Sequence, residues 1–218
     1  MVLIFLSKSI QQRTSLNENI FRVNEHVQSD QEPFSIFQRS ILEREQKFYM
    51  QFMEIIDGKS MVKSLNLCCL GQIRASCNGL VLLENKLKCG GSLVINPVSR
   101  KLVPLPPGTI STPRDESFGF GFCSNSEEYK VVHLFRNENG YVECEIINVG
   151  SRSWRPTDRP SDGIFSWFGT VPVFAIGALN WIPHSDSSEY IVSMGVDDER
   201  FCKIPLRYHR NGRISIVF

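Results

Sequence analysis

The side chains most able to do chemistry are scattered through this chain of 218 residues and do not gather in a recognisable motif. The patterns Gly-x-x-x-x-Gly-Lys-Ser/Thr, His-Glu-x-x-His and Gly-x-Ser-x-Gly, typical of nucleotide-binding proteins, zinc proteases and serine hydrolases, do not occur. The four histidines, at positions 26, 133, 184 and 209, stand far apart. His133 falls in an expected strand and is interpreted as a packed or hydrogen-bonded residue. We predict no catalytic residue and expect that the chain is not an enzyme.

Cysteine and carboxylate side chains could instead bind a metal ion or form disulfides. The seven cysteines are an odd number, no Cys-x-x-Cys occurs, and no histidine lies at ligand spacing from a cysteine pair. The densest acidic run, residues 197–199, has too few ligands for a calcium loop and is interpreted as a solvated turn. We therefore predict no metal site, no cofactor and no cofactor-binding residue, with the cysteines as reduced thiols that pack like small hydrophobic residues.

Charge and apolar segments argue against two further classes of partner. The formal net charge is +1, whereas nucleic-acid-binding proteins concentrate Lys and Arg. The apolar start of the chain is too short for a signal-peptide core, and no basic residue precedes it. The longest later uncharged stretch, residues 163–184, contains two prolines and is not a membrane helix. We expect no nucleic-acid partner, no membrane partner, and a cytoplasmic or nuclear location.

Three segments, residues 94–106, 146–156 and 194–205, repeat one plan and must organise the fold that positions these side chains. Each has an apolar run, an Asn or Asp, a short polar turn that ends in Arg, then a large apolar residue and a proline. The arginines, at 100, 152 and 200, are 52 and 48 residues apart (152−100 and 200−152). A period near 50 with strand-like content predicts a repeat architecture of four-stranded sheets, as in β-propellers.

Each repeat also has an earlier strand, which precedes its arginine by a similar distance. These strands lie at residues 78–83, 129–135 and 177–182. In residues 118–122, Phe-Gly-Phe-Gly-Phe, aromatic and glycine residues alternate, so one face of that strand is bulky and the other is bare. We expect the bare face to let a neighbouring sheet approach closely.

The repeated arginines are interpreted as turn or inter-strand residues whose stems cover apolar surface, not as binding residues. The turn 96–100 is expected to be capped by the side chain of Asn96, and Gly150 is expected to provide the backbone geometry of the turn 148–152.

The two ends of the chain are less regular. Residues 7–23 are polar and fit a helix end or a linker, and residues 33–56 have apolar spacings compatible with either a helix or a strand. Residues 211–218 look like a turn that opens another strand, so the chain is expected to stop inside a fourth repeat. The predicted fold is all-β, an incomplete β-propeller-like array of about three repeat units with an irregular N-terminal segment.

Eight segments in order resemble the plant F-box-associated, kelch-like proteins, over roughly residues 60–206. They are Ser-Cys-Asn-Gly-Leu-Val at 76–81, Val-Ile-Asn-Pro-Val-Ser-Arg-Lys at 94–101, Leu-Pro-Pro at 105–107, Phe-Gly-Phe-Gly-Phe at 118–122, Glu-Tyr-Lys-Val-Val at 128–132, Gly-Ser-Arg-Ser-Trp-Arg at 150–155, Gly-Ala-Leu-Asn-Trp at 177–181 and Asp-Glu-Arg-Phe-Cys-Lys-Ile-Pro at 198–205. The ordered string is far more specific than any one segment. Cys123 and Gly195, where Asp is expected, and Asn180, where His often precedes the Trp, depart from the pattern.

The resemblance implies two domains with different roles. Family members pair an N-terminal F-box, which docks on the Skp1 adaptor of a cullin-based ubiquitin ligase, with a propeller-like domain that selects the target. The leucine-rich F-box segment is absent here, so we expect residues 1–23 to be a linker that follows a missing F-box. Residues 24–218 are expected to form the F-box-associated domain, truncated at its C-terminus. Skp1 is an expected partner only of a version that carries the F-box.

Two functions from different classes follow. The first is a protein-interaction domain resembling the substrate-recognition part of an SCF-type (Skp1-cullin-F-box) E3 ubiquitin ligase, with a protein target to be ubiquitinated as its partner. The alternative is a small-molecule-binding or enzymatic kelch-type propeller. The alternative requires convergent His, Asp or Glu residues, and the sequence shows none.

A target is expected to bind at loops on one rim of the array. The longest irregular loops are residues 108–117 and 155–170, and the second contains Phe165, Trp167 and Phe168. Aromatic side chains are enriched at binding hot spots, so these three are the candidate target-binding residues. The other interpretation is that their rings fill the space between two repeat units.

Overall fold

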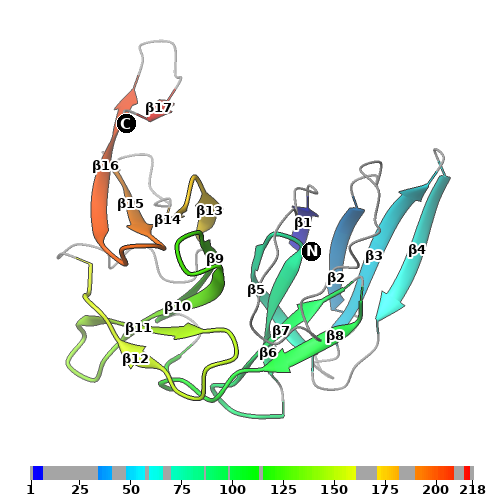
Figure 1. Cartoon of the computed structure of the whole chain (residues 1–218), viewed down its shortest axis with the longest axis horizontal. Helices are drawn as coiled ribbons and strands as arrows, with labels where there is room; N and C mark the ends of the chain where they lie inside the picture. Colours follow the sequence, from blue (N-terminus) through cyan, green and yellow to red (C-terminus); the bar gives the residue numbers. More distant parts are fainter. Residues whose placement is uncertain are drawn as a thin grey trace. The chain divides into compact units, whose positions relative to one another are not determined.

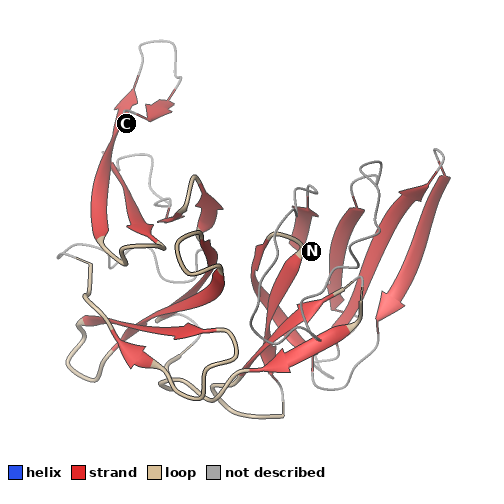
Figure 2. Cartoon of the chain, in the orientation of Figure 1, coloured by secondary structure: helices blue, strands red, loops and turns tan. Residues whose placement is uncertain are grey.

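A computed structural model describes most of the chain. The described residues are 2–6, 34–40, 48–56, 59–65, 70–85, 87–97, 99–112, 115–160, 171–181, 190–208 and 214–216, and their side chains are described between residues 70 and 206. These residues form strands and turns, and the prediction of an all-β, propeller-like fold is confirmed (Figure 2). No helix long and apolar enough to cross a membrane occurs among the described residues.

The chain divides into two compact units, Met1–Pro107 and Gly108–Phe218, which are described separately. Unit 1 contains two four-stranded antiparallel sheets, with strands in sequence order (Figure 1). The first sheet comprises β1 (Val2–Leu6), β2 (Phe34–Ser40), β3 (Phe48–Ile56) and β4 (Lys59–Leu65), and the second comprises β5 (Leu70–Cys77), β6 (Leu80–Asn85), β7 (Ser92–Asn96) and β8 (Lys101–Pro104).

The first sheet corrects the expectation of an irregular N-terminal segment before about three repeats. The apolar spacings of residues 33–56 were compatible with either a helix or a strand. The structure shows two strands there, β2 and β3. They pair in an unbroken register from Phe34 opposite Glu54 to Ser40 opposite Phe48. Both strands are rich in the aromatic and branched residues that favour a pleated surface. Within the segment expected to be a linker, Val2–Leu6 pairs with β2, and residues 7–23 lie outside the described part.

Unit 2 contains the other two sheets. The third sheet has the order β12-β11-β10-β9, and the fourth has the order β13-β14-β15-β16-β17 (Figure 1). Their bounds are Glu116–Cys123 for β9, Glu128–Arg136 for β10, Val142–Asn148 for β11, Arg155–Pro156 for β12, Val173–Ala175 for β13, Ala178–Trp181 for β14, Tyr190–Gly195 for β15, Phe201–Tyr208 for β16 and Ile214–Ile216 for β17. The segment expected to open a fourth repeat contains β17, which instead pairs with β16.

The core of unit 2 lies between its two sheets. Its members are apolar residues from β9 to β11 and from β14 to β15, and Val196: Cys123, Val132, Leu134, Val142, Cys144, Ile146, Leu179, Trp181, Val192, Met194 and Val196. Trp181 is 1% exposed, and its indole Nε1 donates a hydrogen bond of 3.0 Å to Ser117 Oγ, so its polar atom is satisfied within the core.

The bare face of β9 packs as the alternation of Phe and Gly predicts. A Cβ atom at Gly119 would lie 2.6 Å from Leu179 Cδ1, and one at Gly121 would lie 2.8 Å from Val196 Cγ2. These distances are shorter than real Cβ contacts, so side chains of the fourth sheet occupy the space that the two glycines leave. Because Gly119 and Gly121 have no side chains, β13 and β14 can pack close to β9.

The repeated turns also form as expected. The Asn96 side chain accepts a hydrogen bond of 3.1 Å from the Ser99 backbone N–H, and Gly150 has φ +101°. Arg100, Arg152 and Arg200 are exposed, which agrees with their interpretation as turn residues.

Candidate functional site

The predicted target-binding aromatics, Phe165, Trp167 and Phe168, lie outside the described residues. They remain a prediction. The described chain resumes at Val171, directly before β13.

The other predicted recognition loop, residues 108–117, is shorter and more tightly held than expected. Its last two residues belong to β9. The Thr109 backbone N–H donates a hydrogen bond of 2.8 Å to Glu145 Oε1, and the Thr109 hydroxyl donates one of 3.0 Å to Glu145 Oε2. A Cβ at Gly108 would lie 2.6 Å from Glu145 Oε1, so a larger residue would displace the carboxylate from its present position. Ile110 remains exposed, at 69%.

Glu145 belongs to a buried charged group on β9, β10 and β11. Its Oε1 lies 2.8 Å from His133 Nδ1, and the other ring nitrogen, Nε2, lies 3.4 Å from Glu116 Oε2. Phe118 stacks on the imidazole with ring centroids 4.1 Å apart and planes within 3°. We call His133, Glu116 and Glu145 the His133 group. The prediction that His133 is packed or hydrogen-bonded is confirmed, because its side chain is 1% exposed and its Nδ1 lies within hydrogen-bond distance of Glu145.

The carboxylates determine the charge of this histidine. Burial alone would lower the pKa of His133, but the adjacent Glu145 and Glu116 outweigh it, so the pKa lies above its ordinary value. Burial likewise acts to raise the pKa of Glu145, but hydrogen bonds from His133 and Thr109 hold it below its ordinary value. The raised pKa of His133 favours its charged form, and the geometry places that imidazolium between the carboxylates of Glu145 and Glu116.

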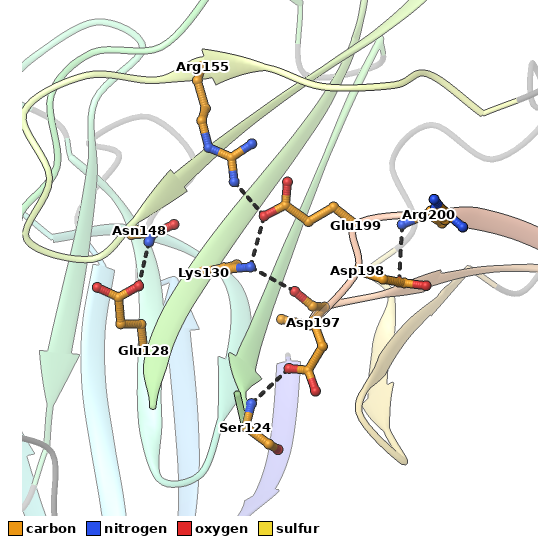
Figure 3. Close-up of polar contacts among 10 residues, drawn as sticks. Ser124, Glu128, Lys130, Asn148, Arg155, Asp197, Asp198, Glu199 and Arg200 are labelled. Atoms are coloured by element: carbon orange, nitrogen blue, oxygen red, sulfur yellow. Dashed lines mark hydrogen bonds and ion pairs between the residues drawn. The ribbon is translucent and has the colours of Figure 1, made fainter. Parts of the chain in front are cut away.

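A second charged group joins the two sheets of unit 2 (Figure 3). Lys130 Nζ, on β10, donates hydrogen bonds of 2.9 Å to the Val196 carbonyl and 2.8 Å to Glu199 Oε1. Arg155, on β12, donates to the same Glu199 oxygen. We call Lys130, Arg155 and Glu199 the Lys130 group. It links the third sheet to the turn between β15 and β16 of the fourth.

This turn corrects the interpretation of the acidic run as merely solvated. Hydrogen bonding to Arg155, together with Lys130, holds the pKa of Glu199 below its ordinary value. Asp197 accepts a hydrogen bond of 2.8 Å from the Ser124 backbone N–H at the end of β9 (Figure 3). The Asp198 side chain instead accepts within its own turn, from the Arg200 N–H at 3.2 Å. Two of the three carboxylates therefore fasten one sheet to the other.

The described cysteines are free thiols: Cys77, Cys89, Cys123, Cys144 and Cys202. Cys77, Cys123 and Cys144 are buried, as the prediction of small core residues requires, whereas Cys89 and Cys202 are exposed, and for these two the prediction is wrong. Burial raises the pKa of Cys77 to about 12, and burial also raises the pKa of Cys144. Both are therefore protonated, unreactive core residues at neutral pH. No group of three or more His, Cys, Asp or Glu residues able to hold a metal ion occurs in the described ranges.

Exposed apolar side chains remain as features able to contact a partner. Among the residues whose side chains the structure describes, the large ones are Leu87, Ile110, Tyr141, Val171, Val173 and Ile176. Three of these six fall between residues 171 and 176, on and around β13. Sequence reasoning missed this cluster, because an apolar edge strand and a buried one have the same composition.

A comparison with known protein families covers most of the residues that form these sheets. Residues 53–217 match the F-box associated beta propeller domain family. The chain belongs to this family. Among similar proteins, the F-box/kelch-repeat protein At3g23880 of Arabidopsis thaliana is 28% identical over 141 residues, which cover 62% of the chain and 38% of that protein.

A second relative, the F-box/LRR-repeat protein At2g43260 of Arabidopsis thaliana, is 25% identical over 132 residues, which cover 52% of the chain and 31% of that protein. The chain thus matches about a third of the length of each of these two relatives. The match confirms the resemblance to plant F-box-associated proteins and agrees with the propeller-like arrangement of sheets.

Proposed function

We propose that this F-box-associated domain recognises a protein target for ubiquitination by an SCF-type ligase. The observation that carries the proposal is the family match over residues 53–217, supported by relatives that are named as F-box proteins. Skp1 is the proposed adaptor of a version that carries an F-box, and the cytoplasm or nucleus is the proposed location.

The test compares the chain with a version in which an F-box is fused to its N-terminus. Proximity labelling in plant cells should enrich a shared set of proteins with both versions, and the abundance of the target should fall only with the fused version. A proteasome inhibitor should restore that abundance. If the labelled proteins match those of an unrelated β-propeller control, the chain does not recognise a target and the proposal fails.

The aromatic segment provides a second, local test of the proposal. Trp167→Ala should reduce capture of the labelled target while the melting temperature stays unchanged. Loss of soluble protein would instead identify Trp167 as a core residue.

A further inference from the structure

The pair Asn-Gly occurs three times in the chain, at 78–79, 139–140 and 211–212. Asparagine followed by glycine can modify itself, because the next backbone nitrogen can attack the side-chain amide and glycine has no Cβ to hinder the approach. The attack requires a nitrogen that has given up its proton and lies close to the asparagine Cγ. The first two pairs belong to the described residues, so the structure compares one reactive dipeptide in two different turns.

The first pair is held in a conformation that opposes the attack. Asn78 and Gly79 have φ +46° and +79° and connect β5 to β6, with Cys77 paired to Leu80. Positive φ at both central residues defines a type I′ turn. The backbone angles of this turn place the asparagine Cβ on the far side of the Cα–C bond from the next nitrogen, so Cγ cannot reach it. Opening the turn would displace Cys77 and Leu80, which are each 4% exposed.

The second pair lies in a surface loop, residues 137–141, which connects β10 to β11. Asn139 is exposed, and its φ is negative, in contrast to that of Asn78. The Gly140 N–H donates a hydrogen bond of 2.9 Å to the Asn137 carbonyl, which keeps this nitrogen from attacking while the loop is closed. None of the five loop residues is buried, so opening the loop removes no side chain from the core.

The hydrogen bonds that close this loop converge on Asn137. Besides accepting from Gly140, it donates through its backbone N–H to the Tyr141 carbonyl at 2.8 Å. Its side-chain Oδ1 accepts from the backbone N–H groups of Asn139, at 3.0 Å, and Tyr141, at 2.9 Å. Water can replace these partners at the surface when the loop opens. The loop therefore opens at a lower cost in free energy than the turn at Asn78.

We propose that Asn139 is a site of spontaneous deamidation and isomerisation, and that the fold protects Asn78 from the same reaction. The inference is independent of the proposed recognition role. In the open loop, the Gly140 nitrogen gives its proton to a base in solution and forms a bond to Asn139 Cγ. The side-chain nitrogen takes up a proton and leaves as ammonia. Water then opens the resulting succinimide at one of its two carbonyls, which gives aspartate or isoaspartate at position 139.

The reaction changes both the charge and the shape of the loop. Either product places a new carboxylate beside Glu138, in a loop where the Asn137 Nδ2 already donates a hydrogen bond of 3.0 Å to Glu143. Isoaspartate also adds a methylene to the backbone, so the loop can no longer close on Asn137 in the same geometry. The modified loop is therefore more acidic and less ordered than the original one.

Mass spectrometry of the whole chain, stored at mildly alkaline pH and physiological temperature, tests the proposal. Trypsin places the pairs in separate peptides, residues 75–86, 137–152 and 211–213, and the chain stored in urea gives the rate of each pair without the fold. Relative to its rate in urea, Asn139 should react about tenfold or more faster than Asn78 in the folded chain. No isoaspartate at position 139, or protection of Asn139 equal to that of Asn78, would overturn the proposal.

A substitution at Asn137 tests whether loop opening controls the reaction. Asn137→Ala removes the side-chain acceptor of two backbone N–H groups, so the rate at Asn139 in the folded chain should rise about tenfold while the rate at Asn78 stays unchanged. Asn125→Ala, at an exposed asparagine in the turn between β9 and β10, is the matched control and should change neither rate. An unchanged rate at Asn139 in Asn137→Ala, or an equal rise at Asn78, would contradict the role of this loop.

Discussion

Strand β10 carries a charged side chain on each of its faces, and the two are neutralised in different ways. His133 finds both carboxylates on the neighbouring strands of its own sheet. Lys130 is also buried, but its partners, Val196 and Glu199, come from the next sheet. The His133 group therefore stabilises one sheet, whereas the Lys130 group stabilises the docking of two.

The largest effect is expected from removing the buried imidazolium. His133→Leu removes the cation that lies between the carboxylates of Glu116 and Glu145, which should lower the free energy of unfolding by about 3–5 kcal/mol. Urea denaturation measures the change. The double variant His133→Leu/Glu145→Leu should recover part of it, because only one buried carboxylate remains. An unchanged midpoint for the single variant would show that the histidine is not charged in the fold.

Breaking the group that joins the sheets should cost less. Lys130→Met removes a charged donor from Glu199 and from the Val196 carbonyl, with an expected loss of about 1–3 kcal/mol. Lys88→Met, at an exposed lysine, is the control and should change stability little. A double-mutant cycle with Glu199→Gln should give a positive coupling. Zero coupling would contradict the assignment of this pair as the link between the sheets.

The two groups should also differ in their response to pH. The pKa of His133 is raised, so its contribution is complete below the unfolded value of about 6.5 and is lost as pH rises through the folded value. The pKa of Glu199 is lowered, so the Lys130 group loses stability only as pH falls below about 4.3. Urea midpoints measured from pH 6 to about 8, below the range in which unfolded thiols ionise and the buried cysteines add a fall of their own, should fall for the wild-type chain and for Lys130→Met. The fall should be absent in His133→Leu.

The smallest effect is expected at the exposed edge of the Lys130 group. The Arg155 side chain is 49% exposed, so its ion pair with Glu199 is screened by solvent. Arg155→Met should change the free energy of unfolding by about 0–1 kcal/mol. Raising the ionic strength to about 1 M, where the Debye length is about 3 Å, should remove most of that difference. A larger loss that persists in high salt would show that Arg155 is as important as Lys130.

Features that depend on local alternation could be predicted from the sequence. The repeat strands, the turn role of Asn96 and the bare face at Gly119 and Gly121 follow from residue types within a few positions. The N-terminal sheet could not be predicted in the same way, because the apolar residues of β2 and β3 fit two periodicities. Only their pairing with each other and with β4 decides between helix and strand.

Features that depend on register or on docking lay beyond sequence reasoning. His133 was assigned to a strand, but its partner Glu145 is 12 residues away and becomes its neighbour through the β10–β11 register. Counting the alternation outward from the hairpin between these strands would have suggested that pair. Glu199 meets Lys130 and Arg155 from 69 and 44 residues away, in another sheet. No local pattern encodes that contact.

The two glycines of β9 have a consequence for recombination between related propellers. Leu179 and Val196 enter the spaces at Gly119 and Gly121 as knobs enter holes, so the two sheets can meet in only one lateral position. A chimaera that takes its fourth sheet from a relative therefore needs apolar side chains of matching size at these two positions. Otherwise the two sheets will shift against each other or leave a packing void. Sheets of this domain can be exchanged between relatives only when the strand with the glycines and the sheet that packs on it are exchanged together.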